Sequence, residues 1–187
     1  MRVVAGRFRG RTLTSPSHEG LRPTSDRVRE SLFNILEHAI AGFNLEGVRV
    51  IDLFAGTGAL GIEAISRGAA YCLFVEENAE ARGLIRQNVE ALGLTGATRI
   101  FRRDATSLGP AGTMAPFALA FVDPPYGKGL GEKALTSLAA GGWLSPGALV
   151  VWEERANVPL VWPTGFNGLD VRTWGDTQIA FARYVSD

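Results

Sequence analysis

The sequence predicts an α/β fold: a mostly parallel sheet of seven strands, helices on both faces, and an antiparallel hairpin at the C-terminal end. The first reason is that short apolar runs alternate with segments of helical spacing from residue 48 onward, as in a parallel sheet with crossover helices. The second is that two strand-like runs, 168–174 and 177–184, close the chain and are joined at Gly175-Asp176, which is typical of a hairpin.

The elements can be assigned in chain order from these patterns. Residues 3–4 and 12–13 can pair as a small hairpin, and Thr24 or Ser25 can cap a helix that runs to about residue 41. The remaining strands are expected at 48–54, 71–76, 98–103, 117–122 and 147–153. The remaining helices are expected at 57–67, 79–92 and 129–140, the second of them ended by Gly93.

Length and composition indicate a compact cytoplasmic protein. The 187 residues suffice for one globular domain that buries roughly 70% of its unfolded surface. We divide the chain into a basic arm or small hairpin, residues 1–24, and a main domain, residues 25–187. There is no run of about 18 apolar residues and no basic-then-apolar leader, so we expect neither a membrane span nor a signal peptide. His18 and His38 lack neighbours at metal-ligand spacing, so we expect no metal site.

The tetrapeptide Asp123-Pro124-Pro125-Tyr126 is the clearest sign of chemistry in the chain, and it directly follows the apolar run 117–122. The Asp123 carboxylate and the Pro124 carbonyl can each accept a hydrogen bond from a planar amino group, while the ring of Tyr126 stacks on the base. Methylation of a nucleobase amino group requires this arrangement. By itself, the motif is also compatible with a rigid turn that merely ends a strand.

A glycine loop lies upstream, where the strand 48–54 runs into a segment of helical spacing. Gly56, Gly58 and Gly61 follow the pattern G-x-G-x-x-G, and Glu76 ends the next strand. Glycines at a helix N-terminus let a ligand approach the backbone, and a carboxylate at a strand end can hold ribose hydroxyls. The pattern therefore fits NAD as well as it fits S-adenosylmethionine.

Two further acids help to separate these cofactors. Asp52 lies four residues before the first glycine, where it would repel a pyrophosphate but could engage the ammonium group of a methionine moiety. Asp104 follows the strand 98–103 and could accept from an adenine amino group. Together with Glu76 and Asp123, these acids end four successive predicted strands, at the edge where open α/β sheets bind ligands.

The neutral net charge of the chain hides a basic N-terminus. Residues 1–29 contain seven arginines and two acids, whereas the rest of the chain has 12 basic and 17 acidic residues. Arginine outnumbers lysine 17 to 2, and its planar fork can hold phosphates and stack on bases. With the Asp-Pro-Pro-Tyr motif present, this predicts an RNA contact rather than a solvated terminus. The candidate RNA-binding residues are Arg7, Arg9, Arg11, Arg22 and Arg27.

Taken together, these residues resemble the class I, Rossmann-like methyltransferases that use S-adenosylmethionine. The segments Arg2–Arg11 and Leu21–Asn34, combined with the Asp-Pro-Pro-Tyr motif, resemble the RsmD family within that class. The resemblance covers nearly the whole chain, although residues 109–116 match no functional motif.

The resemblance implies methyl transfer from S-adenosylmethionine to the exocyclic amino group of a guanine in bacterial 16S ribosomal RNA. It implies a monomeric enzyme that meets this RNA within a small-subunit particle or assembly intermediate. The expected catalytic residues are Asp123, Pro124, Pro125 and Tyr126. The expected cofactor-binding residues are Asp52, Phe54, Gly56, Gly58, Glu76, Asp104 and Ala105.

Three alternatives remain open on the sequence. A protein-glutamine methyltransferase would use a similar proline-proline-tyrosine pocket for a side-chain amide, but the arginine-rich arm would have no purpose. An NAD-dependent oxidoreductase would explain the glycine loop and Glu76, but would leave the motif from Asp123 to Tyr126 unused. A non-catalytic RNA-binding module is the third, and binding of S-adenosylmethionine would count against it.

Overall fold

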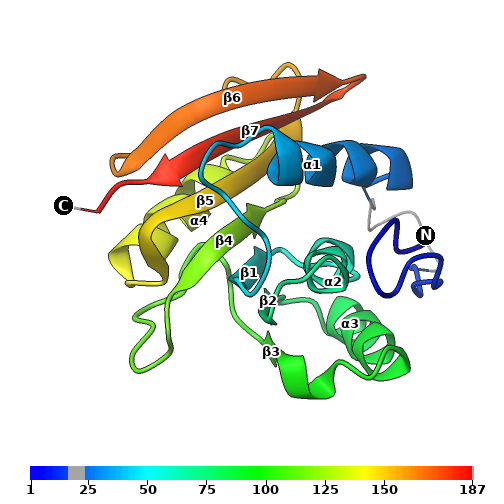
Figure 1. The fold of residues 1–187 in the computed structure, drawn as a ribbon. Coiled ribbons are helices and arrows are strands. Elements are labelled where there is room, and N and C mark those ends of the chain that lie inside the picture. The colour runs from blue at the N-terminus through cyan, green and yellow to red at the C-terminus, as the bar shows by residue number, and fades with distance from the viewer. Residues whose placement is uncertain (17–23, 187) are drawn as a thin grey trace.

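The computed structural model describes residues 1–16 and 24–186. Its centre is a seven-stranded sheet in the order β3-β2-β1-β4-β5-β7-β6. The first five strands are parallel, and β7 runs antiparallel to both β5 and β6. The predicted fold class is therefore confirmed (Figure 1). The strands are β1 (Arg49–Leu53), β2 (Tyr71–Val75), β3 (Thr98–Phe101), β4 (Phe117–Val122), β5 (Leu144–Arg155), β6 (Phe166–Trp174) and β7 (Thr177–Tyr184).

Helices cover both faces of this sheet. They are α1 (Asp26–His38), α2 (Ala59–Ser66), α3 (Ala79–Ala91) and α4 (Leu130–Ala140), with a short 3-10 turn at Thr95–Ala97. Apolar side chains of α1, α2 and α3 pack into one core, whereas those of α4 pack into a second core across the sheet. Ser25 caps α1 as predicted, because its side chain accepts a hydrogen bond from the Val28 amide at 3.2 Å. None of the described helices is long and apolar enough to span a bilayer.

Some boundaries differ from the sequence prediction. Strand β5 begins at Leu144 instead of 147, because a register shift between Phe117 and Leu119 lets Phe117 pair with Leu144 ahead of Gly147. Pro146 and Gly147 suggest that the strand starts at this point and not before it. An irregular strand, however, can contain both residues. Helix α1 ends at His38 instead of 41, and β3 ends at Phe101 instead of 103.

Residues 104–116, between β3 and β4, contain no helix and pack against the sheet on the same face as α4. Ala105 and Leu108 are buried in that core, and Met114 packs against it. The indole Nε1 of Trp143 donates to the Gly109 carbonyl at 2.8 Å. This gives the stretch 109–116, which matches no functional motif, a place in the packing of the domain.

The N-terminal arm is a docked hairpin. Arg2 and Thr12 form the antiparallel bridge, and the Val3 amide donates to the Arg11 carbonyl at 2.9 Å. The buried carboxylate of Glu63, in α2, accepts from the amides of Val4 and Ala5 at 2.8 and 3.1 Å. The predicted hairpin is thus present, and it lies firmly against α2.

The buried side chain of Arg29 also contacts the junction between the arm and α2. Arg29, on α1, is fully buried, and its Nε lies 3.4 Å from Glu63 Oε1. Its Nη2 donates to the Arg2 carbonyl and to Asp26 Oδ1. Arg67 binds the other oxygen of Glu63 at 2.9 Å. A single glutamate therefore joins the arm, α1 and α2.

Candidate active site

A cavity of about 470 Å³ opens at the carboxyl ends of β1, β2, β4 and β5. Its volume falls within the range of about 300–1,000 Å³ that is usual for small-molecule sites. Eight of the predicted site residues line it: Asp52, Phe54, Gly56, Glu76, Asp123, Pro124, Pro125 and Tyr126. The structure thus brings the glycine loop and the Asp-Pro-Pro-Tyr motif to one place, at the edge where open α/β sheets bind ligands.

The glycine loop runs from Phe54 to Gly58 with an unusual backbone. Phe54 has φ of 56°, the one positive value at a non-glycine position among the described residues. Gly56 and Gly58 have φ of 59° and 81°. Left-handed backbone at a bulky residue is costly and is often associated with functional sites. A Cβ at Gly56 would meet one atom, the Phe54 carbonyl oxygen at 4.0 Å, so the space beside it is open to a ligand.

Gly61 has a different role from the two loop glycines. A Cβ there would lie 2.5 Å from Cys72 Sγ and 2.6 Å from Phe74 Cε1, both on β2. Its amide donates to Asp52 Oδ2 at 3.1 Å. The glycine therefore lets the first turn of α2 pack directly on the sheet, which fixes the loop that precedes the helix.

Two carboxylates, those of Asp52 and Glu76, line the cavity beside the glycine loop. Asp52 is 1% exposed, and burial raises the pKa of its carboxyl group well above the usual value. Glu76 accepts from the Gly56 amide at 2.9 Å with one oxygen and from the Asn78 amide at 2.9 Å with the other. Glu76 thus ties the glycine loop to the start of α3, where the Asn78 side chain also accepts from the Ala81 amide.

Three predicted cofactor residues lie outside the lining of this cavity. The exposed Asp104 carboxylate accepts from the amide and hydroxyl of Thr106 at 2.8 and 2.7 Å, and these hydrogen bonds lower its pKa. Ala105 is buried in the core beneath α4. Gly58 is also buried behind the loop instead of lining the cavity.

The Asp-Pro-Pro-Tyr motif forms one wall. Tyr126 is held by its hydroxyl, which donates to Glu153 Oε2 at 3.0 Å and lies 3.3 Å from Thr177 Oγ1. Burial, and then the charge of Glu153, raise the pKa of the Tyr126 phenol, which keeps it protonated as a donor. The following residue, Gly127, donates its amide to Glu154 Oε1 at 3.1 Å. The tyrosine ring therefore has a fixed orientation in the wall.

Several residues that line this cavity were not predicted from the sequence. Thr24, Asn78, Glu153 and Arg155 all face it, and Glu153 accepts from the Thr24 hydroxyl at 3.0 Å. A usable signal was present, because Glu153 and its neighbour Glu154 are adjacent acids at the end of an otherwise apolar strand. The rule that singled out the other strand-end acids applies equally to them.

Asp123 sits at the centre of the acidic groups. Burial raises the pKa of its carboxyl group well above the usual value, and the neighbouring Glu153 raises it further. Asp52 and Glu154 add smaller effects in the same direction. Binding of hydrogen-bond donors here would offset a repulsion that is already present.

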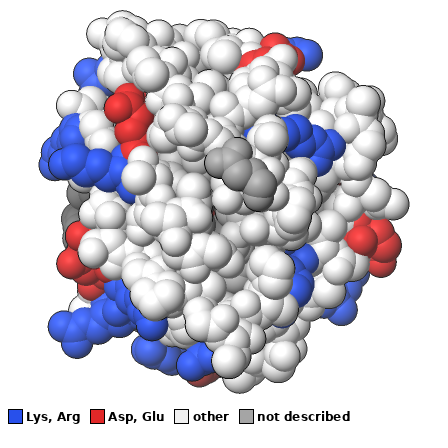
Figure 2. All heavy atoms as spheres, turned by 90° about the vertical axis from the view of Figure 1, so that its left-hand side faces the viewer, with Lys and Arg blue, Asp and Glu red and all other residues white. Residues whose placement is uncertain are grey.

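Of the predicted RNA-binding arginines, those within the described residues lie outside the lining of the cavity. Arg7, Arg9 and Arg11 are exposed on the docked arm, where Arg7 lies over the Phe8 ring and Arg11 donates to the Ala91 carbonyl at 3.0 Å. Arg27 is exposed on α1, and Arg22 lies outside the described residues. Figure 2 shows the end of the molecule that carries the C-terminus, where basic side chains are dispersed toward the margin.

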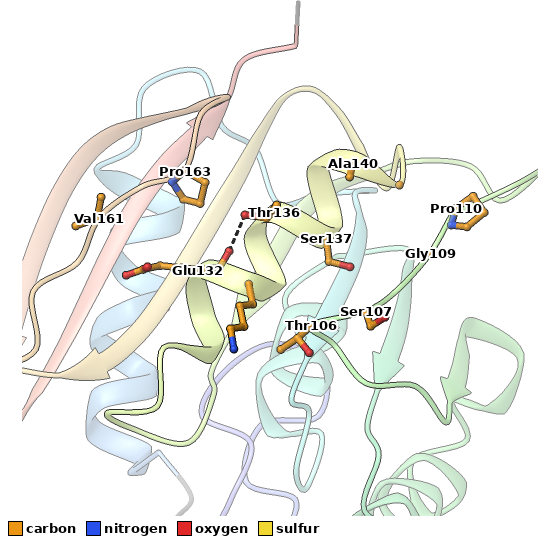
Figure 3. Close-up of a pocket in the computed structure, with 12 residues that line it drawn as sticks. Thr106, Ser107, Gly109, Pro110, Glu132, Thr136, Ser137, Ala140, Val161 and Pro163 are labelled. Carbon is orange, nitrogen blue, oxygen red and sulfur yellow. Dashed lines mark hydrogen bonds between the residues drawn. The ribbon is translucent and has the colours of Figure 1, made fainter.

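A second hollow, of about 780 Å³, lies beside α4 and contains none of the predicted site residues. Figure 3 shows Thr136, Ser137 and Ala140 of α4 in the middle, with Val161 and Pro163 on one side and the segment around Pro110 on the other. Its hydroxyls are engaged locally: Ser137 Oγ accepts from the Leu108 amide at 2.7 Å, and Thr136 donates to the Glu132 carbonyl. The smaller cavity is therefore the candidate active site.

Known proteins are similar to this chain in sequence and in fold. "Ribosomal RNA small subunit methyltransferase D" of Escherichia coli K12 is 39% identical over 168 residues, which cover 87% of this chain and 81% of that protein. A "putative rRNA methyltransferase YlbH" of Bacillus subtilis is 36% identical over 86% of this chain and 85% of its own length. The structure of "putative methyltransferase yhhF from Escherichia coli" superposes with a TM-score of 0.83 and 32% identity, covering 100% of this chain and 99% of that chain.

The fold is therefore that of the class I methyltransferases. Residues 1–183 match the model of a single family, described as "conserved hypothetical protein 95". Because this match spans nearly the whole sequence and is joined by relatives above 30% identity, the chain belongs to that family, the RsmD family.

Proposed function

We propose that the protein transfers a methyl group from S-adenosylmethionine to the exocyclic amino group of a guanine in small-subunit, 16S, ribosomal RNA. The observation that carries this proposal is the cavity that joins the glycine loop, Asp52 and Glu76 to the wall formed by Asp123 and Tyr126. The names of the relatives support ribosomal RNA as the substrate and methyl transfer as the reaction.

The residues of the cavity suit S-adenosylmethionine. The buried Asp52 carboxylate fits its ammonium group, the open space beside Gly56 lets its methionine part approach the loop, and Glu76 fits its ribose hydroxyls. We assign Phe54, Asp104 and Ala105 to the adenosine part, which for Asp104 and Ala105 would extend beyond the cavity lining. When bound, this cofactor supplies an electrophilic methyl group on sulfur.

The protein itself contributes positioning. Asp123 and the Pro124 carbonyl accept the two hydrogens of the amino group, which turns the nitrogen lone pair toward the methyl carbon, while Tyr126 stacks on the flipped base. Once bound, S-adenosylmethionine would supply the methyl group and keep the electron pair of the carbon–sulfur bond on sulfur, and the methylated nitrogen would release one proton to water. Asp123 acts as a hydrogen-bond acceptor and not as a strong base. No strong base is needed because the nitrogen becomes acidic once it is methylated.

Cofactor choice is the first test. The purified protein should bind S-adenosylmethionine and S-adenosylhomocysteine but not NAD, because Asp52 would repel a pyrophosphate placed on the glycine loop. Isothermal titration calorimetry with all three ligands measures this. Micromolar affinity for NAD, together with no binding of either sulfur ligand, would contradict the assignment and would favour an oxidoreductase.

The arginines of the arm give the second test. Replacing Arg7, Arg9 and Arg11 with alanine should weaken RNA binding and flatten its salt dependence by roughly 0.7 units of log-log slope per lost phosphate contact, the single-strand value. Cofactor affinity should not change, since these residues lie outside the cavity. RNA binding of the triple variant and the wild type is measured at several salt concentrations. Parallel salt curves would mean that these side chains contact no phosphate.

A different effect is expected from Arg22 and Arg27. Arg22→Ala and Arg27→Ala should lower turnover more than RNA affinity, because we place both residues beside the reacting nucleotide. Steady-state kinetics on the same RNA separates the two effects. A loss of RNA affinity with unchanged turnover would instead mean that both residues act in the same way as the arginines of the arm.

The cellular experiment tests the substrate. Mass spectrometry of 16S RNA from cells that lack the protein should reveal one unmethylated guanine that reappears as methylguanine when the gene is restored. We propose that the enzyme acts in the cytoplasm as a monomer on a small-subunit particle or assembly intermediate. Comparing naked RNA with purified particles as substrates tests that choice. The protein-glutamine methyltransferase and the oxidoreductase are not favoured by the relatives.

A further inference from the structure

Two carboxylates stand side by side in the candidate active site. Val122 of β4 pairs in parallel with Trp152 of β5, so the next residues, Asp123 and Glu153, leave adjacent strands at the same level. Both line the cavity. Glu153 is 8% exposed, which shows that its carboxylate is held within the site and not in bulk solvent.

Hydrogen bonds hold the Glu153 carboxylate between two other residues that line the cavity. Its two oxygens accept from the hydroxyls of Thr24 and Tyr126, each at 3.0 Å, and both of these residues line the same cavity. Each carboxylate oxygen has two lone pairs, so acceptor capacity remains beside each hydroxyl. Asp123 and Glu153 together thus offer two neighbouring acceptors to a base that lies against Tyr126.

The bases that carry an amino group differ at the ring nitrogen next to it. Guanine places the N1–H donor beside its amino group, whereas adenine and cytosine place an unprotonated acceptor nitrogen there. Enzymes that flip a base read this Watson–Crick edge with hydrogen bonds. Two adjacent acceptors complement guanine, and they would set a carboxylate against a lone pair in adenine or cytosine.

We infer that Glu153 determines the base specificity of the enzyme by accepting a hydrogen bond from N1–H of the target guanine, while Asp123 and the Pro124 carbonyl hold its amino group. This inference rests on the proposed function and adds to it a residue outside the Asp-Pro-Pro-Tyr motif. Burial, and then the neighbouring Glu153, raise the pKa of Asp123, and guanine offsets the cost of two adjacent carboxylates by supplying a donor to each. A base without the N1 hydrogen leaves Glu153 facing a lone pair and is rejected.

The test replaces the target guanosine by 2-aminopurine riboside in a synthetic RNA fragment that wild-type enzyme methylates. This analogue keeps the amino group but has an unprotonated N1 and no O6. Wild-type enzyme should use it with kcat/KM at least about 100-fold below that for guanine, since polar sites reject substrates that leave their groups unpaired. If wild-type enzyme used both RNAs within about threefold, the inference would be wrong, whatever the variants do.

The variant Glu153→Gln should change this preference. The amide can donate to N1 of 2-aminopurine and still accept from the Tyr126 hydroxyl, so the guanine preference should shrink at least tenfold. The loss of O6 affects wild type and variant alike, and therefore cancels in the comparison. A purely structural role for Glu153 would lower both rates equally and leave the preference unchanged, which would overturn the inference.

Glu154→Gln is the matched control. It makes the same chemical change one residue along β5, in a side chain that binds the Gly127 and Arg155 amides. Its guanine preference should match that of wild type, and an equal shift in both variants would count against a specific role for Glu153. Thermal melting and cofactor titration verify that each variant is folded. Absence of guanine methylation by the wild-type enzyme would instead refute the proposed function.

Discussion

Asp123→Ala is expected to reduce the rate of methyl transfer by about two orders of magnitude or more, while cofactor affinity stays within a few fold. In the proposed mechanism, the substitution removes the acceptor that orients the amino nitrogen, and positioning supplies most of the rate. Tyr126→Ala should have a similar effect, because it removes the stacking surface that Glu153 and Thr177 hold in place. Single-turnover methylation and calorimetric titration of the cofactor separate rate from binding.

Asp123→Asn serves as the control for this prediction, because the amide keeps one acceptor oxygen and loses the charge. It should retain clearly more activity than the alanine variant. A fully active Asp123→Ala enzyme would require abandoning the proposed pocket.

The pH dependence of turnover gives a second measurement. The raised pKa of Asp123 means that its carboxylate is protonated at a higher pH than usual, so wild-type turnover should fall as the pH is lowered through that pKa. Burial, and then the charges of Glu153, Asp52 and Glu154, raise the pKa of the Asp123 carboxyl group. Glu153→Gln should therefore move the acid limb to lower pH.

Gly61→Ala is expected to weaken both the fold and cofactor binding. The added Cβ would lie 2.5 Å from Cys72 Sγ and 2.6 Å from Phe74 Cε1, so α2 must move away from β2. Overpacking of this kind costs about 1–3 kcal/mol. Since the helix start also fixes the glycine loop, affinity for S-adenosylhomocysteine should fall at least about tenfold. Thermal melting and calorimetry measure the two effects.

Gly83→Ala provides the opposite expectation at another helical glycine. No atom lies within 4 Å of a Cβ at Gly83, which is in the interior of α3. Alanine should therefore raise stability by about 1 kcal/mol through its higher helix propensity. If Gly61→Ala were as stable as Gly83→Ala, the close packing of α2 on β2 would not hold in solution.

Much of this architecture could be predicted from the sequence, because strand and helix periodicity is local information. The strand 117–122 was predicted with its observed bounds, and the acids after successive apolar runs indicated the ligand-binding edge. The cavity gathers Asp52, Glu76 and Asp123 from three different strand ends. Parallel strands guarantee that convergence once their order is known.

What the sequence could not provide depends on contacts between distant segments. Glu153 is 30 positions beyond Asp123, and its nearness follows from the pairing of β4 with β5, which local patterns do not specify. Glu63 reads as an ordinary helix residue, yet it is completely buried between arginines. The position of Asp104 outside the cavity depends on the loop 104–116, whose path no periodicity predicts.

The docked hairpin at the N-terminus changes how RNA association should be understood. A flexible basic tail loses conformational entropy when it closes on a polyanion, typically about 1–2 kcal/mol per residue for the backbone alone. Here Glu63 holds the Val4 and Ala5 amides, and Ser66 Oγ accepts from the Phe8 amide at 3.0 Å, so that ordering has already occurred during folding. The backbone of the arm is therefore ordered before binding, and under the role proposed for Arg7, Arg9 and Arg11 it would act as a preformed template for RNA phosphates.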